Sequence, residues 1–190
     1  MNRCSPMPER RVALVLLAAG EGARFGGDKL GATFNGRPLI DHALAAAEGT
    51  RVTRRIVVRR TQAAPLSLGP NWQLVVNAQA AEGIASSIRA GVEAALDCDR
   101  IVIALADMPL IDAAHLDRIA QATGTIFTRQ ADGHPGPPAA FDRSSFSRLA
   151  GLQGDRGAAS LDLDDARIVD APSRRQLQDV DCPEDLEGWS

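Results

Sequence analysis

The amino-acid sequence predicts an α/β protein with a three-layer α/β/α, Rossmann-like fold and a mostly parallel central sheet. Short apolar runs alternate with longer helix-like stretches, which indicates βα repetition. Aromatic residues make up only 4% of the chain and Tyr is absent, so Ala, Val, Leu and Ile carry the apolar content. That composition favours a helix-covered parallel sheet over a β-sandwich. Because no long linker or internal repeat interrupts the 190 residues, we expect residues 1–190 to form a single domain.

The strands are predicted from short runs rich in β-forming residues. The run IVIALA is apolar throughout, which is typical of a central strand covered on both faces. The first run follows Arg10 and Arg11 and could also be interpreted as an export signal. It is far shorter than the roughly 20 residues that span a bilayer, and a buried strand ending in a glycine loop explains the same letters. The expected strands are Val12–Ala18, Arg55–Val58, Gln73–Val76, Ile101–Ala106 and Thr125–Thr128.

The helices are predicted from apolar periodicity together with start signals. Pro38 precedes the first helix, Asp112 is the expected N-cap of the third, and Asp142 is a possible cap of the fourth. A short last helix should begin at Pro183, where the missing N–H of proline does no harm. The other expected helices are Leu39–Glu48, Ile84–Leu96, Ala113–Ala122 and Arg143–Ala150, and the expected loops are Gly133–Pro138 and Gly151–Gly157.

Charge and cysteine content exclude several classes of protein. The net charge is −3 and the isoelectric point about 5.6, unlike the basic surface of a general nucleic-acid binder. Cys4, Cys98 and Cys182 lie far apart without a CxxC spacing, so a disulfide framework or a structural zinc site is not expected. We therefore expect a cytoplasmic protein with reduced cysteines that binds neither nucleic acid nor membrane.

The segment after the first strand is the most informative part of the sequence. It reads LAAGEGARFGGDK and interleaves four glycines with Arg24 and Lys29. Glycine permits positive φ and removes side chains that would keep a ligand away from the backbone. Successive N–H groups can then converge on an anion, while the two cations supply full positive charges. This pattern predicts a loop that binds a triphosphate.

Other glycine loops fit the same segment less well. A dinucleotide-binding loop requires GxGxxG, whereas Gly20, Gly22 and Gly26 give a spacing that is one residue longer. A Walker A loop requires GK[ST] at its end, whereas Asp28 follows Gly27 and Leu30 follows Lys29. An ordinary flexible turn remains the alternative, although it does not require four glycines and two cations.

Five segments resemble, in the same order, those of the molybdenum cofactor cytidylyltransferases, and more broadly those of the nucleotidyltransferases that include the guanylyl enzyme of the same pathway. The resemblance covers nearly the whole chain, and LAAG and GIASS are more similar to the cytidylyl branch. The segments are LAAGEGARFGGDK, VVNAQAAEGIASSIRAG, LADMPLI, GDRGAASL and DVDCPEDL.

The resemblance implies a nucleotidyltransferase fold and a reaction. CMP from CTP would be transferred to a phosphorylated acceptor such as molybdopterin, with release of pyrophosphate and with Mg²⁺ as cofactor. Arg24 and Lys29 would bind the β- and γ-phosphates, and Asp107 would bind Mg²⁺ together with Asp179 or Asp181. The remaining nucleotide contacts would come from Leu17, Ala18, Ala19, Gly20, Gly22, Asn77, Gly83 and Ser87.

The carboxylates have a physical rationale that is independent of the resemblance. Asp107 closes an apolar strand, and ligands of open α/β sheets gather at the carboxyl ends of strands. Mg²⁺ prefers hard oxygen ligands, and alternation would place Asp179 and Asp181 on the same side of an extended segment. Structural alternatives remain open: a turn at Asp107 and a helix cap at Asp181.

The other predicted contacts have structural alternatives as well. Gly83 could simply precede a helix, Ser87 could be a surface residue, and Asn77 is a common turn former. His42, His115 and His134 are isolated from one another in the sequence, so a histidine-based metal site or nucleophile is not expected.

Two departures from the family pattern bear on the acceptor. Pro137 stands where a GxP segment usually carries a polar or basic residue, and Ala159 stands where GDxGAR carries Arg.

Three alternative functions remain open: guanylyl transfer, sugar-phosphate nucleotidyl transfer, and a nucleotide-binding protein or oxidoreductase without transfer activity. The glycine spacing argues against NAD, and the presence of both Lys29 and Asp107 argues against an inactive relative.

Overall fold

A seven-stranded sheet forms the centre of the molecule in this computed structural model, which describes residues 10–20, 22 and 25–186. The strand order is β5-β4-β1-β6-β8-β7-β9. The first four strands in this order are parallel, β8 is antiparallel to both neighbours, and β7 and β9 are parallel. This mixed, mostly parallel sheet confirms the predicted fold class. The strands are β1 (Val12–Ala18), β4 (Arg54–Arg60), β5 (Trp72–Asn77), β6 (Arg100–Leu105), β7 (Ile126–Arg129), β8 (Pro135–Asp142) and β9 (Arg167–Val169).

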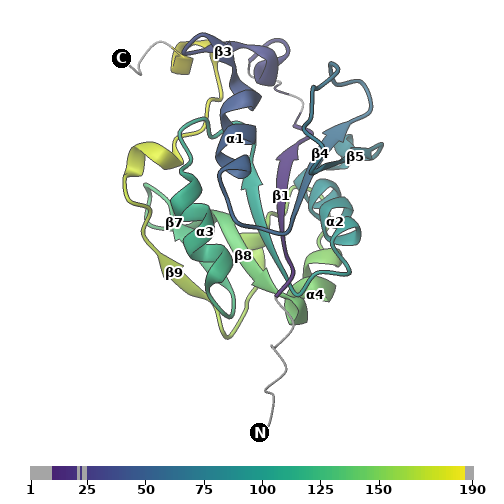
Figure 1. Cartoon of the computed structure of the whole chain (residues 1–190), viewed down its shortest axis with the longest axis vertical. Coiled ribbons are helices and arrows are strands. Elements are labelled where there is room, and N and C mark those ends of the chain that lie inside the picture. The colour runs from purple at the N-terminus through teal and green to yellow at the C-terminus, as the bar shows by residue number, and fades with distance from the viewer. Residues whose placement is uncertain (1–9, 21, 23–24, 187–190) are drawn as a thin grey trace, which may run out of the picture.

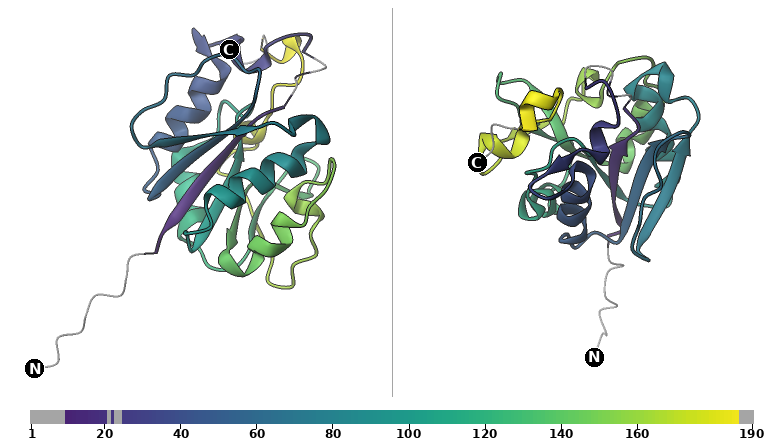
Figure 2. Two further views of the ribbon diagram at one scale, coloured as in Figure 1. Left: turned by 90° about the vertical axis from the view of Figure 1, so that its right-hand side faces the viewer. Right: turned by 90° about the horizontal axis from the view of Figure 1, so that it is seen from above.

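Helices cover both faces of the sheet and complete the three layers (Figure 1). α1 (Leu39–Glu48) and α3 (Ala113–Gln121) pack on one face, and α2 (Ile84–Ala94) and α4 (Phe146–Ala150) pack on the other (Figure 2). A small hairpin, β2 (Thr33–Phe34) and β3 (Arg37–Pro38), precedes α1. The 3₁₀ turns are Lys29–Gly31, Ala80–Glu82, Arg143–Ser145, Ala158–Ser160, Arg174–Leu177 and Pro183–Leu186.

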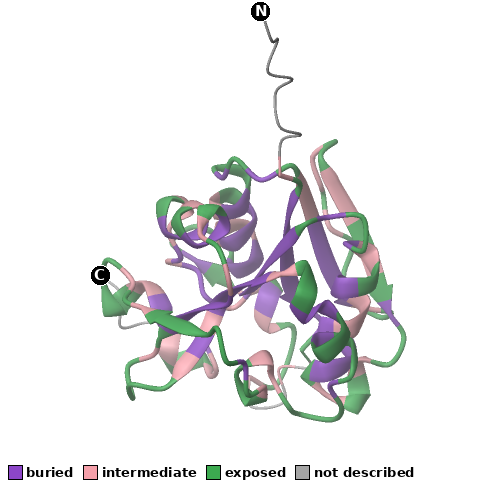
Figure 3. Cartoon of the chain, turned by 90° about the horizontal axis from the view of Figure 1, so that it is seen from below, coloured by how far each residue is buried: buried purple, intermediate pink, exposed green. Residues whose placement is uncertain are grey.

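The central strand β1 explains why its sequence is apolar without alternation. Leu14 and Leu16 face the core layer that contains α1 and α3, whereas Val15 and Leu17 face the layer that contains α2. All seven residues of the strand are buried, as Figure 3 shows for the centre of the sheet. α2 approaches this strand closely, because a Cβ built on Gly91 would lie 2.4 Å from Val15 Cγ1.

The main correction to the predicted elements concerns residues 133–138, because Pro135–Pro138 begin β8 instead of forming a loop. Prolines are rarely found inside a sheet because they cannot donate to the ladder. Here the pairing with β7 jumps from Phe127–Ala139 to Thr128–Gly136, so Pro137 and Pro138 fall in a bulge. The bulge therefore allows a proline-rich sequence to form part of a strand.

The predicted fourth helix also differs in the structure. Its first turn is 3₁₀ and the α-helix begins only at Phe146. Asp142 forms no side-chain cap there, because its carboxylate accepts hydrogen bonds from buried Arg100 (Nη1–Oδ1 2.5 Å) and from the N–H of Gly124 (2.6 Å). The expected cap at Asp112 is confirmed, since its Oδ1 accepts from the N–H of Ala114. Among the described residues, no helix is long and apolar enough to cross a membrane.

Candidate active site

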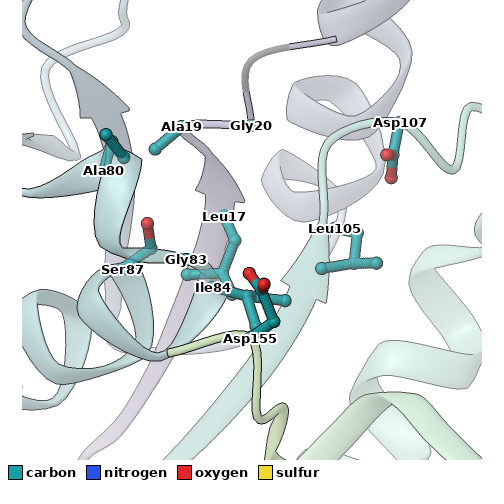
Figure 4. A pocket seen from close by; sticks show the side chains of 11 residues that line it. Leu17, Ala19, Gly20, Ala80, Gly83, Ile84, Ser87, Leu105, Asp107 and Asp155 are labelled. Atoms are coloured by element: carbon teal, nitrogen blue, oxygen red, sulfur yellow. The ribbon is translucent and has the colours of Figure 1, made fainter. Parts of the chain in front are cut away.

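A cavity of about 300 Å³ lies where β1 and β6 end. Ligands of open α/β sheets bind at this edge, next to the loops that leave the carboxyl ends of parallel strands. Figure 4 shows the loop after β1, the start of α2 and the end of β6 around this space. The volume is at the lower end of the range for small-molecule sites. The residues that line it are Leu17, Ala19, Gly20, Ala80, Ala81, Gly83, Ile84, Ser87, Leu105, Asp107 and Asp155.

The glycine loop bends where its backbone adopts positive φ. Gly22 has φ 62° and Gly26 has φ 74°, a region that other residues rarely occupy. The N–H of Phe25 donates to the carbonyl of Gly22 (2.8 Å), and the N–H of Lys29 donates to the carbonyl of Gly27 (3.0 Å). These turns bring Lys29 back towards the sheet. Arg24, the other predicted cation of the loop, lies outside the described residues.

Lys29 connects the loop to two of the predicted carboxylates. Its Nζ lies 2.8 Å from Asp107 Oδ2 and 3.4 Å from Asp181 Oδ1. The Lys29 side chain is only 12% exposed, so water screens these contacts less than it does at the surface. Burial lowers the pKa of Lys29, but Asp107 and then Asp181 outweigh this effect and raise it above its ordinary value. The lysine is therefore a full positive charge in contact with two carboxylates.

Asp107 has one oxygen that is available to a further ligand. Oδ1 is buried and has no hydrogen-bond partner in the described part of the chain. A buried unpaired carboxylate oxygen is costly, which makes such an atom a candidate for binding a cation. Hard carboxylate oxygens of this kind are what Mg²⁺ and Mn²⁺ prefer.

The segment that carries Asp179 and Asp181 is attached directly to the strand end. The N–H of Val180 donates to the carbonyl of Asp107 (3.0 Å), and Val180 itself is fully buried between the two aspartates. Loss of hydration, together with the charges of Asp107 and Asp181, raises the pKa of Asp179, although part of this residue is exposed to solvent. The three predicted carboxylates are thus neighbours.

These carboxylates do not form a preassembled metal cage. No group of three or more His, Cys, Asp or Glu side chains within the described ranges is arranged to hold a metal ion. Mg²⁺ commonly uses one or two carboxylates and completes its shell with substrate phosphates and water. The unpaired oxygen of Asp107 beside further carboxylates fits that kind of site.

Asn77, one of the predicted nucleotide contacts, is held by side-chain hydrogen bonds at the end of its strand. It is buried at the end of β5 and does not line the cavity; its Nδ2 donates to Ser86 Oγ (2.8 Å) and Ser87 Oγ (3.0 Å). Its Oδ1 accepts from the N–H of Gln79 (2.9 Å). Asn77 therefore fixes the first turn of α2, while Ser87 on that turn lines the cavity.

Gly83 is the point where two loops meet at the cavity. It has φ 101°, and a Cβ built there would lie 2.4 Å from Asp155 Oδ1 and 2.5 Å from the carbonyl oxygen of Gly154. The N–H of Ala85 donates to the same carbonyl (3.1 Å). Only glycine fits at this contact, which joins the start of α2 to the loop at residues 151–157.

Sequence reasoning missed several residues of the cavity wall. Asp155, Ile84 and Leu105 line it but were not among the predicted site residues. Asp155 stands in the GDRGAASL segment, which marked this loop as relevant. Ile84 and Leu105 could not be singled out in advance, because their apolar side chains are indistinguishable in the sequence from core residues.

Known proteins share both this sequence pattern and this fold. Residues 14–168 match the MobA-like NTP transferase domain. The purine catabolism protein PucB of Bacillus subtilis is 32% identical, over 91% of this chain and 93% of its own length. A nucleotidyl transferase from Methanothermobacter superimposes with a TM-score of 0.79 at 25% identity, covering 94% of this chain and 95% of that one.

A third relative bears on the metal site. Rv0371c from Mycobacterium tuberculosis superimposes with a TM-score of 0.75 at 27% identity, covering 95% of this chain and 97% of its own. A further structure of the same protein is a complex with manganese, which supports a divalent metal in proteins of this kind. The domain match spans most of the chain, and the chain belongs to the MobA-like NTP transferase family.

Proposed function

We propose that this nucleotidyltransferase transfers CMP from CTP to a phosphorylated acceptor of the molybdopterin type and releases pyrophosphate. The observation that carries the proposal is the Lys29–Asp107 pair, which lies at a ligand-sized cavity directly after the glycine loop. Lys29 comes from the loop and Asp107 from the end of β6, so a phosphate chain bound by the lysine and a cation bound by the carboxylate would lie side by side. The divalent metal would be Mg²⁺, held by Asp107 and by Asp179 or Asp181.

The reaction requires positioning more than acid–base catalysis. An oxygen of the acceptor phosphate attacks the α-phosphorus of CTP, the bond from this phosphorus to the bridging oxygen breaks, and pyrophosphate leaves with that electron pair. A phosphate nucleophile is already ionised at neutral pH, so no general base is needed. Among the described residues that line the cavity there is no His or Cys. Catalysis would depend on orientation and charge neutralisation.

Lys29 would exchange one set of partners for another when the nucleotide binds. In the structure its ammonium group pairs with Asp107 and Asp181. Incoming phosphates offer several negatively charged acceptor oxygens, so we expect Nζ to turn towards them, with Gly22 supplying a backbone N–H group. This exchange leaves the Asp107 carboxylate to a cation. A divalent ion there would neutralise negative charge on the reacting phosphates.

The remaining predicted contacts are assigned on the same basis. Leu17, Ala19, Gly20, Gly83 and Ser87 line the cavity and would contact base and ribose. Ala18 contributes through the backbone, Asn77 acts indirectly by fixing α2, and Arg24 would join Lys29 at the phosphates. CTP is preferred over GTP because LAAG and GIASS resemble the cytidylyl branch. Sugar-phosphate transfer on the same fold is the alternative reaction.

The nucleotide can be identified by heat unfolding in the presence of Mg²⁺ with each of the four common NTPs. A ligand that binds only the folded state stabilises it according to its occupancy, so CTP at about 100 times its Kd should raise Tm by about 5 to 10 °C. The other three NTPs should give smaller shifts. A larger shift with GTP would contradict the CTP assignment, and no shift with any NTP would contradict the transferase proposal.

A further inference from the structure

A second, smaller cavity adjoins the proposed nucleotide site. Its volume is about 80 Å³, and it shares Leu17, Ile84 and Leu105 with the first cavity. Figure 4 shows Leu105 below Asp107, with Leu17 and Ile84 across the space from it. Every residue that lines the second cavity is apolar or glycine. The lining consists of Leu17, Ile84, Ile88, Ile103, Leu105, Phe127, Gly136, Pro137, Ala139, Gly157, Ala158 and Ala159.

The floor of this cavity is part of the rigid core, and its rim is accessible. Ile88 of α2, Ile103 of β6 and Ala139 of β8 are 2%, 4% and 3% exposed. Ala159, in the 3₁₀ turn at Ala158–Ser160, is exposed at the rim. That turn is held by Ser160, whose N–H and hydroxyl both donate to the carbonyl of Gly157 (3.0 and 2.8 Å). A small group can therefore enter from the nucleotide side without unfolding the core.

The β8 wall of the cavity offers almost no hydrogen bonding. Pro137 and Pro138 have no N–H, and both of their carbonyls are already engaged. Gln130 Nε2 donates to the carbonyl of Pro137 (2.7 Å), and Thr128 Oγ1 donates to that of Pro138 (2.7 Å). A hydroxyl group placed here would lose its hydrogen bonds to water and gain none in return, which is unfavourable.

We propose that this second cavity binds an uncharged, apolar part of the acceptor, about the size of one ring, that lies next to the acceptor phosphate. The inference rests on the proposed function, and it names the class of acceptor. If the acceptor phosphate lies near Asp107, the rest of the acceptor must extend past Leu105, Leu17 and Ile84. These three residues also line the apolar cavity. Phosphate esters with a flat or apolar body fit it, whereas hydroxyl-rich sugar phosphates do not.

The test compares two phosphate monoesters of equal charge, phenyl phosphate and glycerol 3-phosphate. Each is titrated into the whole protein with Mg²⁺ while backbone amide NMR signals are followed. Phenyl phosphate should bind at least about tenfold more tightly, because its ring is buried in an apolar cavity, and it should shift the signals of Gly136, Ala158 and Ala159. Equal affinity for the two esters would overturn the inference.

A matched pair of variants assigns the preference to the cavity. Ala159→Leu adds an apolar side chain at the exposed rim and should reduce the affinity ratio to near one. Ala114→Leu makes the same change at an exposed position of α3 and should leave the ratio unchanged. An unchanged ratio in Ala159→Leu would also overturn the inference. If CTP binds normally but the two esters bind equally, only the acceptor class fails, whereas absence of NTP binding overturns the proposed function.

Discussion

Lys29 and Asp107 show how two residues that stand out in the sequence come together in the fold. Each was predicted from its motif, and the structure brings their charged atoms to 2.8 Å although 78 positions separate them. Asn77 shows what a motif leaves out. The resemblance implies a nucleotide contact for this residue, and in the structure its amide donates to the two serine hydroxyls of α2, Ser86 and Ser87. Such side-chain pairing depends on tertiary packing, which a motif does not describe.

Gly83 permits a sharp prediction at the same scale. Gly83→Ala would place a Cβ within 2.6 Å of the Gly154 backbone at a φ of 101°. Strain at such a position is of the order of 1 to 3 kcal/mol, and we expect at least that decrease in the free energy of unfolding. The loop at residues 151–157 should also move away from the cavity and weaken CTP binding. Urea unfolding and CTP titration measure the two effects.

Gly151→Ala provides the control for this prediction. Gly151 has a negative φ of −86°, and a Cβ there would meet only ordinary contacts at 3.5 Å. We expect the free energy of unfolding to change by less than about 1 kcal/mol, because alanine adopts this backbone conformation without strain. Equal effects of the two substitutions would show that the contact at Gly83 is not constrained as described.

The packing of helix α3 on the sheet depends on a buried neutral histidine. His115 is 1% exposed, and its Nε2 lies 2.8 Å from Thr128 Oγ1. Because the Thr128 hydroxyl donates to Pro138, Nε2–H is the donor to Thr128, and Nδ1 then accepts from Arg118 Nη2 (2.8 Å). Burial, followed by the charge of Arg118, lowers the pKa of His115 from 6.5 to about 4.

Because of His115, the free energy of unfolding of the protein should decrease in mild acid. Between pH 6.5 and pH 4 the unfolded chain binds a proton at His115 and the folded chain does not, so the contribution is complete above pH 6.5 and declines as pH falls. From pH 7 to pH 5 the loss is about 2 kcal/mol. Urea unfolding at both pH values should show a smaller decline in His115→Gln. His134→Gln, in an exposed loop, is the matched control, and an undiminished decline in His115→Gln would contradict the assignment.

Elements with clear periodicity were predictable, and those shaped by their neighbours were not. The bounds predicted for β1 and α1 are those of the structure, because apolar patterning and Pro38 define them locally. β8 was missed because Pro137 and Pro138 are tolerated there only in a bulge opposite β7. The short edge strand β9 has only three residues, Arg167–Val169, and exists because β7 offers a partner.

At the scale of the whole molecule, the proposed nucleotide site and the apolar cavity are formed by two different halves of one sheet. The parallel strands β5, β4, β1 and β6 carry the glycine loop and Asp107 at their carboxyl ends, where α/β proteins bind ligands. The antiparallel strand β8 contributes the apolar wall beside them. The position of the first half could be predicted from the order of the βα units in the sequence. The apolar wall could not, because it depends on how the loop at residues 151–157 folds over α2.

Segments that are far apart in the sequence also come together at the site. Lys29 contacts Asp181, 152 positions away, and the N–H of Val180 donates to the Asp107 carbonyl. Family motifs predicted that these segments act together. That Lys29 pairs with the carboxylates, which by themselves form no metal cage, could be seen only in three dimensions. It implies that metal and triphosphate bind together, each completing the site for the other.

That linkage is tested most directly by calorimetric titration of CTP with and without Mg²⁺, using the wild type, Asp107→Asn and, as a control at an exposed position, Asp162→Asn. The account predicts that Mg²⁺ strengthens CTP binding at least about tenfold, a coupling of about 1.4 kcal/mol. The wild type and Asp162→Asn should both show this gain, and Asp107→Asn should lose it. Undetectable CTP binding by the wild type with saturating Mg²⁺, or an undiminished Mg²⁺ effect in Asp107→Asn, would contradict it.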